Sequence, residues 1–549
     1  MRAFAELLDR LSLTGSRNAK LRLVRDYLRE TPDPDRGWAL AALTGDLSFN
    51  AAKPAFIRKA VEARMDPQLF WWSYDYVGDL AETVALVWPR RPGANREPEL
   101  SEVVEALRTA TRAEVQALIE GWLDAMDEPR ERWALLKLMT GGLRVGLTAR
   151  LAKRAAAEMG EAGAVEPAEI EELWHALHPP YEDLFAWLEG RSEKPSSDNP
   201  GRFRPVMLAQ AIDEAVDFAK LDPADYAAEW KWDGIRVQLV HEAGARRLYT
   251  RTGDDISRTF PDLVDALFEE GVIDGELLVL KEGKAASFAD LQQRLNRKAV
   301  DAKLMAKYPA GIRAYDLLAE GREDTRTLSF AERRKRLEAF VGRQASPRID
   351  LSPMQPFDGW PALAALRANP PSGDPQVAEG LMLKRWDSLY EAGRPKGPWF
   401  KWKRDPFLID AVLMYAQRGH GKRSSFYSDY TFGVWTSGED GGRALTPVGK
   451  AYFGFTDEEL KQIDKYVRDN TIERFGPVRS VRAEPHHGLV FEVAFEGLQR
   501  SGRHKSGVAM RFPRISRIRW DKPPGEADEL AALERMLVQM EGGSATVGR

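Results

Sequence analysis

The hydrophobic positions of the first 190 or so residues follow a helical period. In SRNAKLRLVRDYL, which begins at Ser16, Leu21, Val24 and Leu28 share one helical face, and Ser16 can cap the start of the helix. The same period recurs in SEVVEALRTATRAEVQALIEGWL and EPRERWALLKLM, with Pro and Gly between the segments. No repeat of fixed length is present, so we expect a compact all-α domain over residues 1–195 rather than a solenoid.

The pattern changes at EKPSSDNPGRFRP, Glu193–Pro205, whose Pro, Ser and Asn content predicts a linker. Short apolar alternations follow in IRVQLV, RRLYT, GELLVL and GIRAYDLL, which predict strands, and TLSFAERRKRLEAF predicts a helix. We therefore expect an α+β domain over residues 203–404.

A second boundary lies near Lys403–Phe407, because Pro406 cannot occupy a central strand. Beyond it, FLIDAVLMYA, DYTFGVWT, GLVFEVAFEGL and RFPRISRIRW predict strands, and EELKQIDKYVRDNTIERF predicts one helix. These elements fit a small β-barrel of the five-stranded OB type over residues 405–540. The last residues, EGGSATVGR, have the composition of a disordered tail.

Composition restricts the class of protein. A chain of 549 residues with 43% hydrophobic and 30% charged residues is typical of a globular protein of several domains. We expect a cytoplasmic location, since no apolar run approaches the roughly 20 residues of a membrane span and the N-terminus lacks a signal-peptide pattern. The chain has no cysteine, which excludes disulfides, thiolate catalysis and cysteine-built zinc sites. The net charge of -4 does not favour nucleic-acid binding, so local basic clusters decide that question.

The stretch EWKWDGIRVQL, which begins at Glu229, places Lys231 between two tryptophans and two carboxylates. A free lysine amine has a pKa of about 10.4, so it is protonated at neutral pH. A nucleophilic lysine needs burial or nearby cations to lower this pKa. The alternative is a half-exposed strand with an ion pair. The pattern K-x-D-G arises by chance in about one chain in ten of this length, so it does not decide between the two.

Five further segments follow in order. They are LYTRTGDDISRTFPDL with Arg251, VIDGELLVL with Glu276, AGIRAYDLL with Tyr315, AEGLMLKRW with Glu379 and Lys384, and GPWFKWKRD with Lys401 and Lys403. Together with the lysine stretch, their order and spacing resemble the motifs of the covalent nucleotidyltransferases. That superfamily includes ATP-dependent DNA ligases, RNA ligases and mRNA capping enzymes.

The resemblance implies that Lys231 attacks the α-phosphate of ATP, expels pyrophosphate and forms lysyl-AMP. Glu229 would accept a hydrogen bond from the adenine amino group, and Tyr315 would stack on the ring. Glu276 and Glu379 would supply hard oxygen ligands for Mg²⁺.

Basic residues would complete this site. In the resemblance, Arg236 and Arg251 hold sugar or phosphate groups, and three lysines neutralise charge on the α-phosphate: Lys384, Lys401 and Lys403. The run RFPRISRIRWDK also resembles the last ligase motif, which closes over ATP and orients pyrophosphate, with Arg514 and Arg517 as its candidate contacts.

Two N-terminal segments, LTGSRNAK and GGLRVGLTARLAKR, resemble the helical DNA-binding domain that precedes the core in ATP-dependent DNA ligases. Glycine amides and helix N-termini can bind phosphate without reading bases. The alternative is a glycine-rich helical hairpin with surface charge. The candidate DNA contacts are Arg17, Lys20, Arg144 and Arg150, with Arg418, Lys422 and Arg423 in the barrel loop YAQRGHGKRSSFYSDY.

The resemblance covers almost the whole chain, and it is to the three-domain bacterial ATP-dependent DNA ligases of the B type. NAD-dependent ligases share the core but carry a cysteine-built zinc finger, which this chain cannot form. We therefore predict a monomeric ligase that uses ATP and Mg²⁺ and encircles nicked duplex DNA, in repair, replication or recombination. An RNA ligase and a non-catalytic DNA-binding protein with a decayed core remain as alternatives.

Overall fold

The chain divides into two compact units, one formed by Met1–Ser196 with Phe407–Arg549 and one by Ser197–Pro406. The computed structural model describes residues 1–49, 53–91, 93, 96–160, 165–196, 200–281, 283–295, 297, 300–371, 378–419, 426–437 and 442–540. Within these ranges, no helix is both long enough and apolar enough to cross a membrane. The predicted disordered tail lies outside them.

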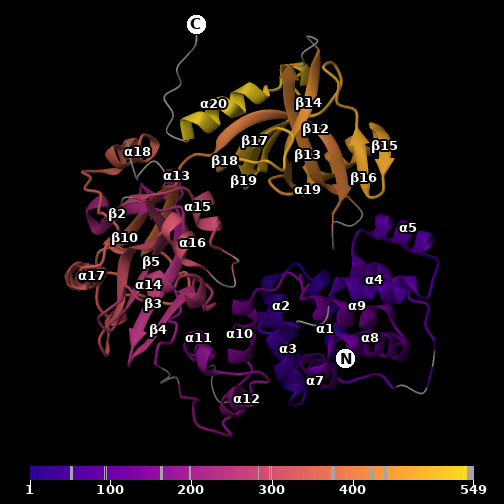
Figure 1. The fold of residues 1–549 in the computed structure, drawn as a ribbon, viewed down its shortest axis with the longest axis horizontal. Helices are drawn as coiled ribbons and strands as arrows, with labels where there is room; N and C mark the ends of the chain where they lie inside the picture. Colours follow the sequence, from indigo (N-terminus) through magenta and orange to yellow (C-terminus); the bar gives the residue numbers. More distant parts are fainter. Residues whose placement is uncertain are drawn as a thin grey trace. The chain divides into compact units, whose positions relative to one another are not determined.

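The N-terminal part of the first unit is all-α, as predicted (Figure 1). Ser16 caps α2 by accepting a hydrogen bond from the Ala19 amide at 3.4 Å. Phe4, Leu8 and Trp38 belong to one continuous apolar core. The helices are α1 Arg2–Leu13, α2 Arg17–Glu30, α3 Asp35–Thr44, α4 Pro54–Glu62, α5 Pro67–Val77, α6 Leu80–Val87, α7 Leu100–Thr109, α8 Arg112–Ala125, α9 Pro129–Thr140, α10 Ala149–Ala157, α11 Pro167–Leu173 and α12 Glu182–Leu188.

The second unit contains two sheets. The smaller has strand order β1-β11-β10-β2, from β1 Gln210–Ala211, β2 Tyr226–Lys231, β10 Gly380–Arg385 and β11 Trp399–Lys403. The larger follows β4-β3-β5-β7-β8, with β6 beside β5 and β9 beside β7. Its strands are β3 Ile235–Glu242, β4 Ala245–Thr250, β5 Gly271–Lys281, β6 Lys284–Ala285, β7 Ala310–Glu320, β8 Glu323–Asp324 and β9 Ile349–Leu351. The four strands predicted from IRVQLV, RRLYT, GELLVL and GIRAYDLL are thus confirmed.

The chain passes from the smaller sheet to the larger one immediately after Lys231, through Gly234. A Cβ atom at Gly234 would lie 2.4 Å from the Leu277 carbonyl oxygen on β5, so only glycine allows this close approach. The lysine therefore lies where the two sheets meet.

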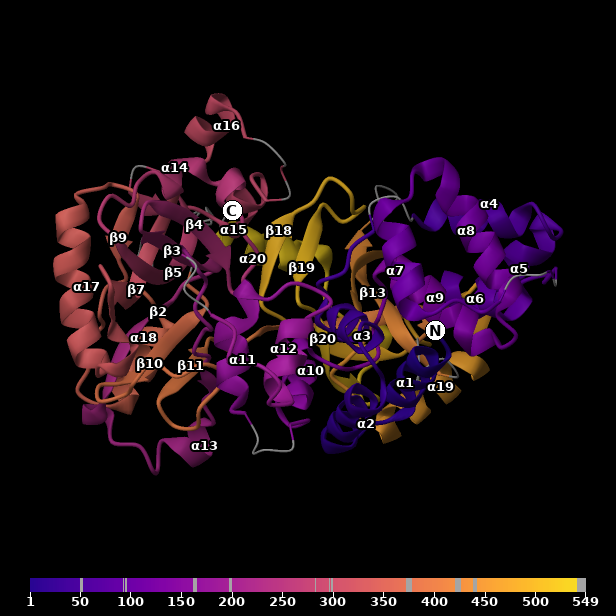
Figure 2. The same ribbon diagram turned by 90° about the horizontal axis from the view of Figure 1, so that it is seen from below.

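Helix α17, Phe330–Gln344, packs against β7 and β9 of the larger sheet (Figure 2). Its Arg333 and Asp316 of β7 form a fully buried ion pair, with Nε–Oδ1 at 2.7 Å and Nη2–Oδ2 at 3.1 Å. Arg333 also donates to two carbonyl oxygens, so its charge is well compensated. The remaining helices of this unit are α13 Glu214–Asp217, α14 Pro261–Val264, α15 Phe288–Gln292, α16 Ala302–Lys307 and α18 Trp360–Ala368.

The C-terminal part of the first unit is a curved antiparallel sheet of the OB type, ordered β14-β13-β12-β16-β15, with β17 joining β12 to β20 and a separate β18-β19 pair. The strands are β12 Phe407–Arg418, β13 Tyr427–Ser437, β14 Arg443–Ala451, β15 Thr471–Phe475, β16 Val478–Val481, β17 Val490–Phe495, β18 Gly497–Arg500, β19 Val508–Arg511 and β20 Arg514–Arg519. Two helices accompany them, α19 Asp457–Asp469 and α20 Leu530–Met540.

Two details of the barrel prediction are wrong. The segment EELKQIDKYVRDNTIERF is not one helix, because α19 ends at Asp469 and Thr471–Phe475 forms a strand. The β-branched and aromatic residues of TIERF favour a strand, and the Gly476 and Pro477 turn lets it pair with β16. The barrel also has more strands than the five predicted. The sequence did not indicate β14 to β16, because these segments lack a strong apolar alternation.

Breaking the buried Arg333 pair should destabilise the second unit. Replacement of Asp316 by Ala leaves a guanidinium without its counter-ion, and we expect a loss of about 3–5 kcal/mol in the free energy of unfolding. Hydrogen exchange of the β5 and β7 amides in the full-length protein measures this loss. As a control, Lys461→Ala removes an exposed pair with Glu458 and should change stability by less than about 0.5 kcal/mol. Equal exchange rates in the Asp316 variant and the parent chain would contradict the prediction.

Candidate active site

The predicted nucleophile and several predicted partners share one face of the smaller sheet. Lys231 lies opposite Gly380, which lies opposite Lys403, and Glu229 lies in the neighbouring row with Lys401. Residues directly opposed in antiparallel strands point to the same face, so the register alone brings these side chains together. Motifs that are far apart in the sequence therefore contribute side chains to one face of this sheet.

Lys231 is half-buried and forms an ion pair with Glu379, the residue before β10. Lys403 approaches the same carboxylate at 3.6 Å. Trp230 and Trp232 are buried, with 2% and 4% exposure, in an apolar cluster that includes Leu381 of β10. The Lys231 amine is therefore fixed next to a carboxylate and a second cation.

Glu276 and Glu379 provide two carboxylates beside this lysine. Burial raises the pKa of Glu276 to about 8, although Lys231 and Arg236 act in the opposite direction, and Glu379 and Asp274 raise it further. A divalent cation would displace the proton that such a carboxyl retains near neutral pH. Among the described residues no group of three or more protein ligands surrounds a metal position. Two carboxylates fit Mg²⁺ nevertheless, because this ion usually takes its remaining ligands from phosphates and water.

Several cations lie close together across the two sheets. Partial burial, followed by Arg394 and Lys403, lowers the pKa of Lys401, with smaller contributions from Lys231 and Arg251. The pKa of Arg251 is likewise lowered, by burial and then by Arg236 and Arg394. These shared causes indicate that the cations lie in one region, where Glu276 and Glu379 compensate only part of the positive charge. A polyphosphate would supply the missing negative charge.

Arg236 is held in a network that the sequence reasoning missed. Its guanidinium donates to both oxygens of Asp274, at 3.0 and 2.5 Å, to the Met207 carbonyl at 2.6 Å and to the Tyr390 hydroxyl at 3.1 Å. Tyr390 in turn donates to Asp274 at 2.6 Å, and Arg236 lies 5.8 Å from the ring centroid of Tyr315. Four of the five guanidinium N–H groups are therefore committed to holding the side chain.

Lys384, which the resemblance assigns to the α-phosphate, is buried and has protein partners in this structure. Its side chain is 2% exposed, and its Nζ is 3.1 Å from Glu229 Oε1 and 3.1 Å from the Tyr315 carbonyl oxygen. A strand pattern gives the face of a side chain but not the depth of its terminal amine, so the sequence did not indicate these partners.

The helical candidates separate into exposed and buried residues. Three of these arginines are exposed: Arg17 at the start of α2, Arg144 in the loop before α10, and Arg150 in the first turn of α10. Lys20 is buried, and its Nζ donates to the carbonyls of Val145 and Gly146 at 2.6 and 2.9 Å. The structure thus places Lys20 beneath the loop that carries Arg144, which differs from the expected surface contact.

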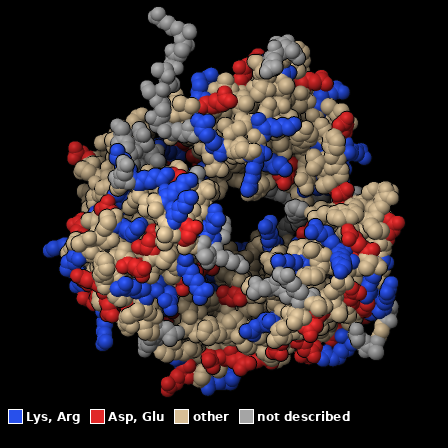
Figure 3. Space-filling view, in the orientation of Figure 1, with Lys and Arg blue, Asp and Glu red and all other residues tan. Residues whose placement is uncertain are grey.

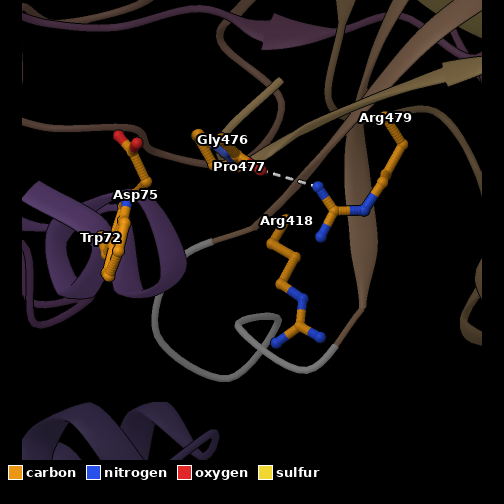
Figure 4. A pocket seen from close by; sticks show the side chains of 6 residues that line it. All are labelled: Trp72, Asp75, Arg418, Gly476, Pro477 and Arg479. Carbon is orange, nitrogen blue, oxygen red and sulfur yellow. Dashed lines mark hydrogen bonds between the residues drawn. The ribbon is translucent and has the colours of Figure 1, made fainter. Parts of the chain in front are cut away.

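In the barrel, Arg418 lies 5.8 Å from the ring centroid of Tyr427, which Arg479 also approaches, at 5.7 Å. Figure 4 shows these two arginines, with the hydrogen bond from Arg479 to the Gly476 carbonyl. Lys422 and Arg423 lie outside the described residues.

The two candidates on β20 differ in exposure. Arg517 is exposed and lies 3.7 Å from Glu492, and Arg514 is half-buried. Elsewhere, basic and acidic side chains are mixed over the surface (Figure 3), in keeping with the small net charge.

Comparison with known proteins agrees with this geometry. The family model described as ATP dependent DNA ligase domain matches residues 206–403, that of the DNA ligase N terminus matches 1–157, and that of the ATP dependent DNA ligase C terminal region matches 423–522. A probable DNA ligase of Koribacter versatilis is 30% identical over 98% of this chain and 96% of that protein. DNA ligase 1 of Korarchaeum cryptofilum is 30% identical over 96% and 97%.

The chain spans 63% of a third relative, a probable DNA ligase of Opitutus terrae, at 30% identity over 99% of this chain. The solved structure named Pmar-Lig_PreS3 shares the fold, with a TM-score of 0.58, 14% identity and coverage of 94% of this chain and 99% of that one. The matches extend over the helical, adenylation and barrel parts, and the chain belongs to the ATP-dependent DNA ligase family.

Proposed function

We propose that this protein seals nicks in duplex DNA, joining a 5′-phosphate to a 3′-hydroxyl at the expense of ATP. The observation that carries the proposal is the Lys231 amine, paired with the Glu379 carboxylate that Lys403 also approaches, on the face that carries Glu229 and Lys401. An amine fixed beside several cations has the surroundings that attack on a nucleotide phosphate requires.

The reaction takes three steps. The Lys231 Nζ attacks the α-phosphorus of ATP, forming an N–P bond while the bond to pyrophosphate breaks and the amine loses a proton. An oxygen of the DNA 5′-phosphate then attacks the same phosphorus and releases the lysine. Finally the 3′-hydroxyl attacks the activated 5′-phosphate, and AMP leaves. Lys401 and Lys403 stabilise the charge that develops in the first step.

Other residues bind the nucleotide in this proposal. Glu229 accepts from the adenine amino group, and Tyr315 stacks on the base. Arg251 binds phosphate, and Arg236 holds the nucleotide with its remaining N–H group. Mg²⁺ would be held by Glu276 and Glu379 and would neutralise phosphate charge.

We further propose three domains, over residues 1–195, 203–404 and 405–540, in a monomer that encircles the nicked duplex. Arg514 and Arg517 would orient pyrophosphate when the barrel domain closes over ATP, about a hinge near Lys403–Phe407. Exposed arginines of the helical domain would contact DNA phosphates, namely Arg17, Arg144 and Arg150, together with the half-buried Arg418 of the barrel.

Covalent labelling tests the nucleophile. Incubation with α-labelled ATP and Mg²⁺ should label the protein, and a chase with nicked duplex DNA should discharge the label and seal the nick. Lys231→Ala should abolish the label, whereas Lys220→Ala, which removes an exposed lysine from the turn between α13 and β2, should retain it. Label on the Lys231 variant would remove this residue as the nucleophile, and discharge by RNA ends in preference to DNA would favour an RNA ligase.

Removal of the Tyr390 hydroxyl should weaken ATP binding. Tyr390→Phe deletes the hydrogen bonds to Asp274 and Arg236, and an under-satisfied buried carboxylate costs about 1–3 kcal/mol. We expect the KM for ATP in the labelling reaction to rise about tenfold, with a smaller change in the maximal rate. Tyr249→Phe is the control, because that hydroxyl donates to the Gly201 carbonyl at 2.8 Å. An unchanged KM in the Tyr390 variant would show that the network does not orient Arg236.

The salt dependence of binding to a nicked duplex should separate Arg144 from Lys20. Arg144→Ala should lower the slope of log affinity against log salt by about 1, as expected for one lost phosphate contact. Lys20→Met should weaken binding by releasing the loop and leave the slope unchanged, since the buried amine contacts carbonyls. A lower slope for the Lys20 variant would restore it as a phosphate contact.

A further inference from the structure

Lys384 lies in an aromatic cage inside the second unit. Its Nζ is 4.6 Å from the ring centroid of Tyr315, 4.8 Å from that of Phe330 and 4.7 Å from that of Trp399. Two of its hydrogens are directed to Glu229 Oε1 and to the Tyr315 carbonyl, each at 3.1 Å. The rings exclude water from the ammonium and stabilise its charge, so the amine acts on one carboxylate at close range.

Glu229 is enclosed to the same degree, with a side chain that is 2% exposed. Glu229 lies opposite Met382 and Lys384 opposite Ala227, so the two side chains are diagonal neighbours on one sheet face. A carboxylate taken out of water is costly unless a counter-ion and hydrogen bonds compensate it. Lys384 supplies both.

We propose that Lys384 is a positioning residue for base selection: it holds the Glu229 carboxylate in one orientation for the base of the nucleotide. The inference rests on the proposed role of Glu229 in reading adenine. It replaces the contact between Lys384 and the α-phosphate that the sequence motif implied.

The charge of this carboxylate distinguishes the two purines. An ionised carboxylate accepts a hydrogen bond from the 6-amino group of adenine, whereas the 6-oxo group of guanine is itself an acceptor and is repelled. Without Lys384, the carboxylate loses the partner that fixes its acceptor oxygens toward the base, and the discrimination against the guanine oxygen weakens. Lys384 therefore favours ATP over GTP through Glu229.

The test measures formation of labelled protein from α-labelled ATP and from α-labelled GTP, with the full-length chain and Mg²⁺. For Lys384→Met we expect the KM for ATP to rise about 10- to 100-fold and the ATP-to-GTP ratio of kcat/KM to fall at least about tenfold, with a smaller change in the maximal rate. Lys281→Met is the matched control, because Lys281 also pairs with an acid, Asp290, at 2.9 Å and lies 5.5 Å from the Tyr308 ring, but is exposed. Its nucleotide preference should stay at the parent value.

A double-mutant cycle identifies the route of the effect. If Lys384 acts through Glu229, adding Lys384→Met to Glu229→Gln should leave the nucleotide preference of the single Glu229 variant nearly unchanged. Should Lys384→Met fail to fold, by circular dichroism, Lys384→Gln and Trp399→Phe carry the same test, with the same expected fall in preference.

Three outcomes separate the possible failures. A lower maximal rate with an unchanged ATP-to-GTP ratio would overturn the inference and return Lys384 to the reacting phosphate. An unchanged ratio in Glu229→Gln would overturn the reading of adenine by Glu229, and the inference with it. Absence of label from both nucleotides in the parent chain would overturn the proposed function itself.

Discussion

The need to balance charge in a partly dry pocket organises the second unit of this protein. Carboxylates and cations face each other where the two sheets meet, and each buried charge has a specific partner: Asp274 for Arg236, and Glu229 for Lys384. Because an unpaired buried charge is costly, these partners are fixed before any ligand arrives. Lys401 and Arg251 differ, since neighbouring cations contribute to lowering the pKa of each. The site therefore combines paired buried charges with neighbouring cations whose charge a triphosphate can neutralise.

The same division explains how one site can both hold a nucleotide firmly and carry out chemistry on it. The residues proposed to bind the base, Glu229 among them, are enclosed and paired, which favours selectivity because a mismatched hydrogen-bonding group would leave a buried partner unsatisfied. Lys231, Lys403 and Glu379 are more exposed, with side chains 24%, 37% and 21% accessible. Reacting groups need this access, since the phosphate they act on must meet a second substrate in the following step.

Much of the architecture could be predicted from the sequence, because strand and helix periods are local properties. The four strands of the larger sheet follow directly from alternation, and the ordered motifs place Lys231, Glu276, Tyr315 and Lys401 in one site. The strand Thr471–Phe475 was missed because its residues are mostly exposed and it follows a helix without a break in polarity. Asp274 could have been found, since it precedes Glu276 by two residues and so shares its face of β5. Tyr390 carries no such local signal, and only the fold brings it to Arg236.

Two buried lysines, Lys20 and Lys384, show what a motif leaves undetermined. A lysine in a basic segment is expected to meet phosphate, yet the length of its side chain also lets it cross the interior and donate to carbonyls or a carboxylate. Lys20 does so for Val145 and Gly146, and Lys384 for Tyr315 and Glu229. In both cases the residues that it holds belong to a proposed ligand-binding element: the loop with Arg144, and the base pocket. A buried cation can thus contribute to binding by fixing the shape and charge of groups that meet the ligand, and substitution of such a lysine should alter selectivity or loop order rather than the number of phosphate contacts.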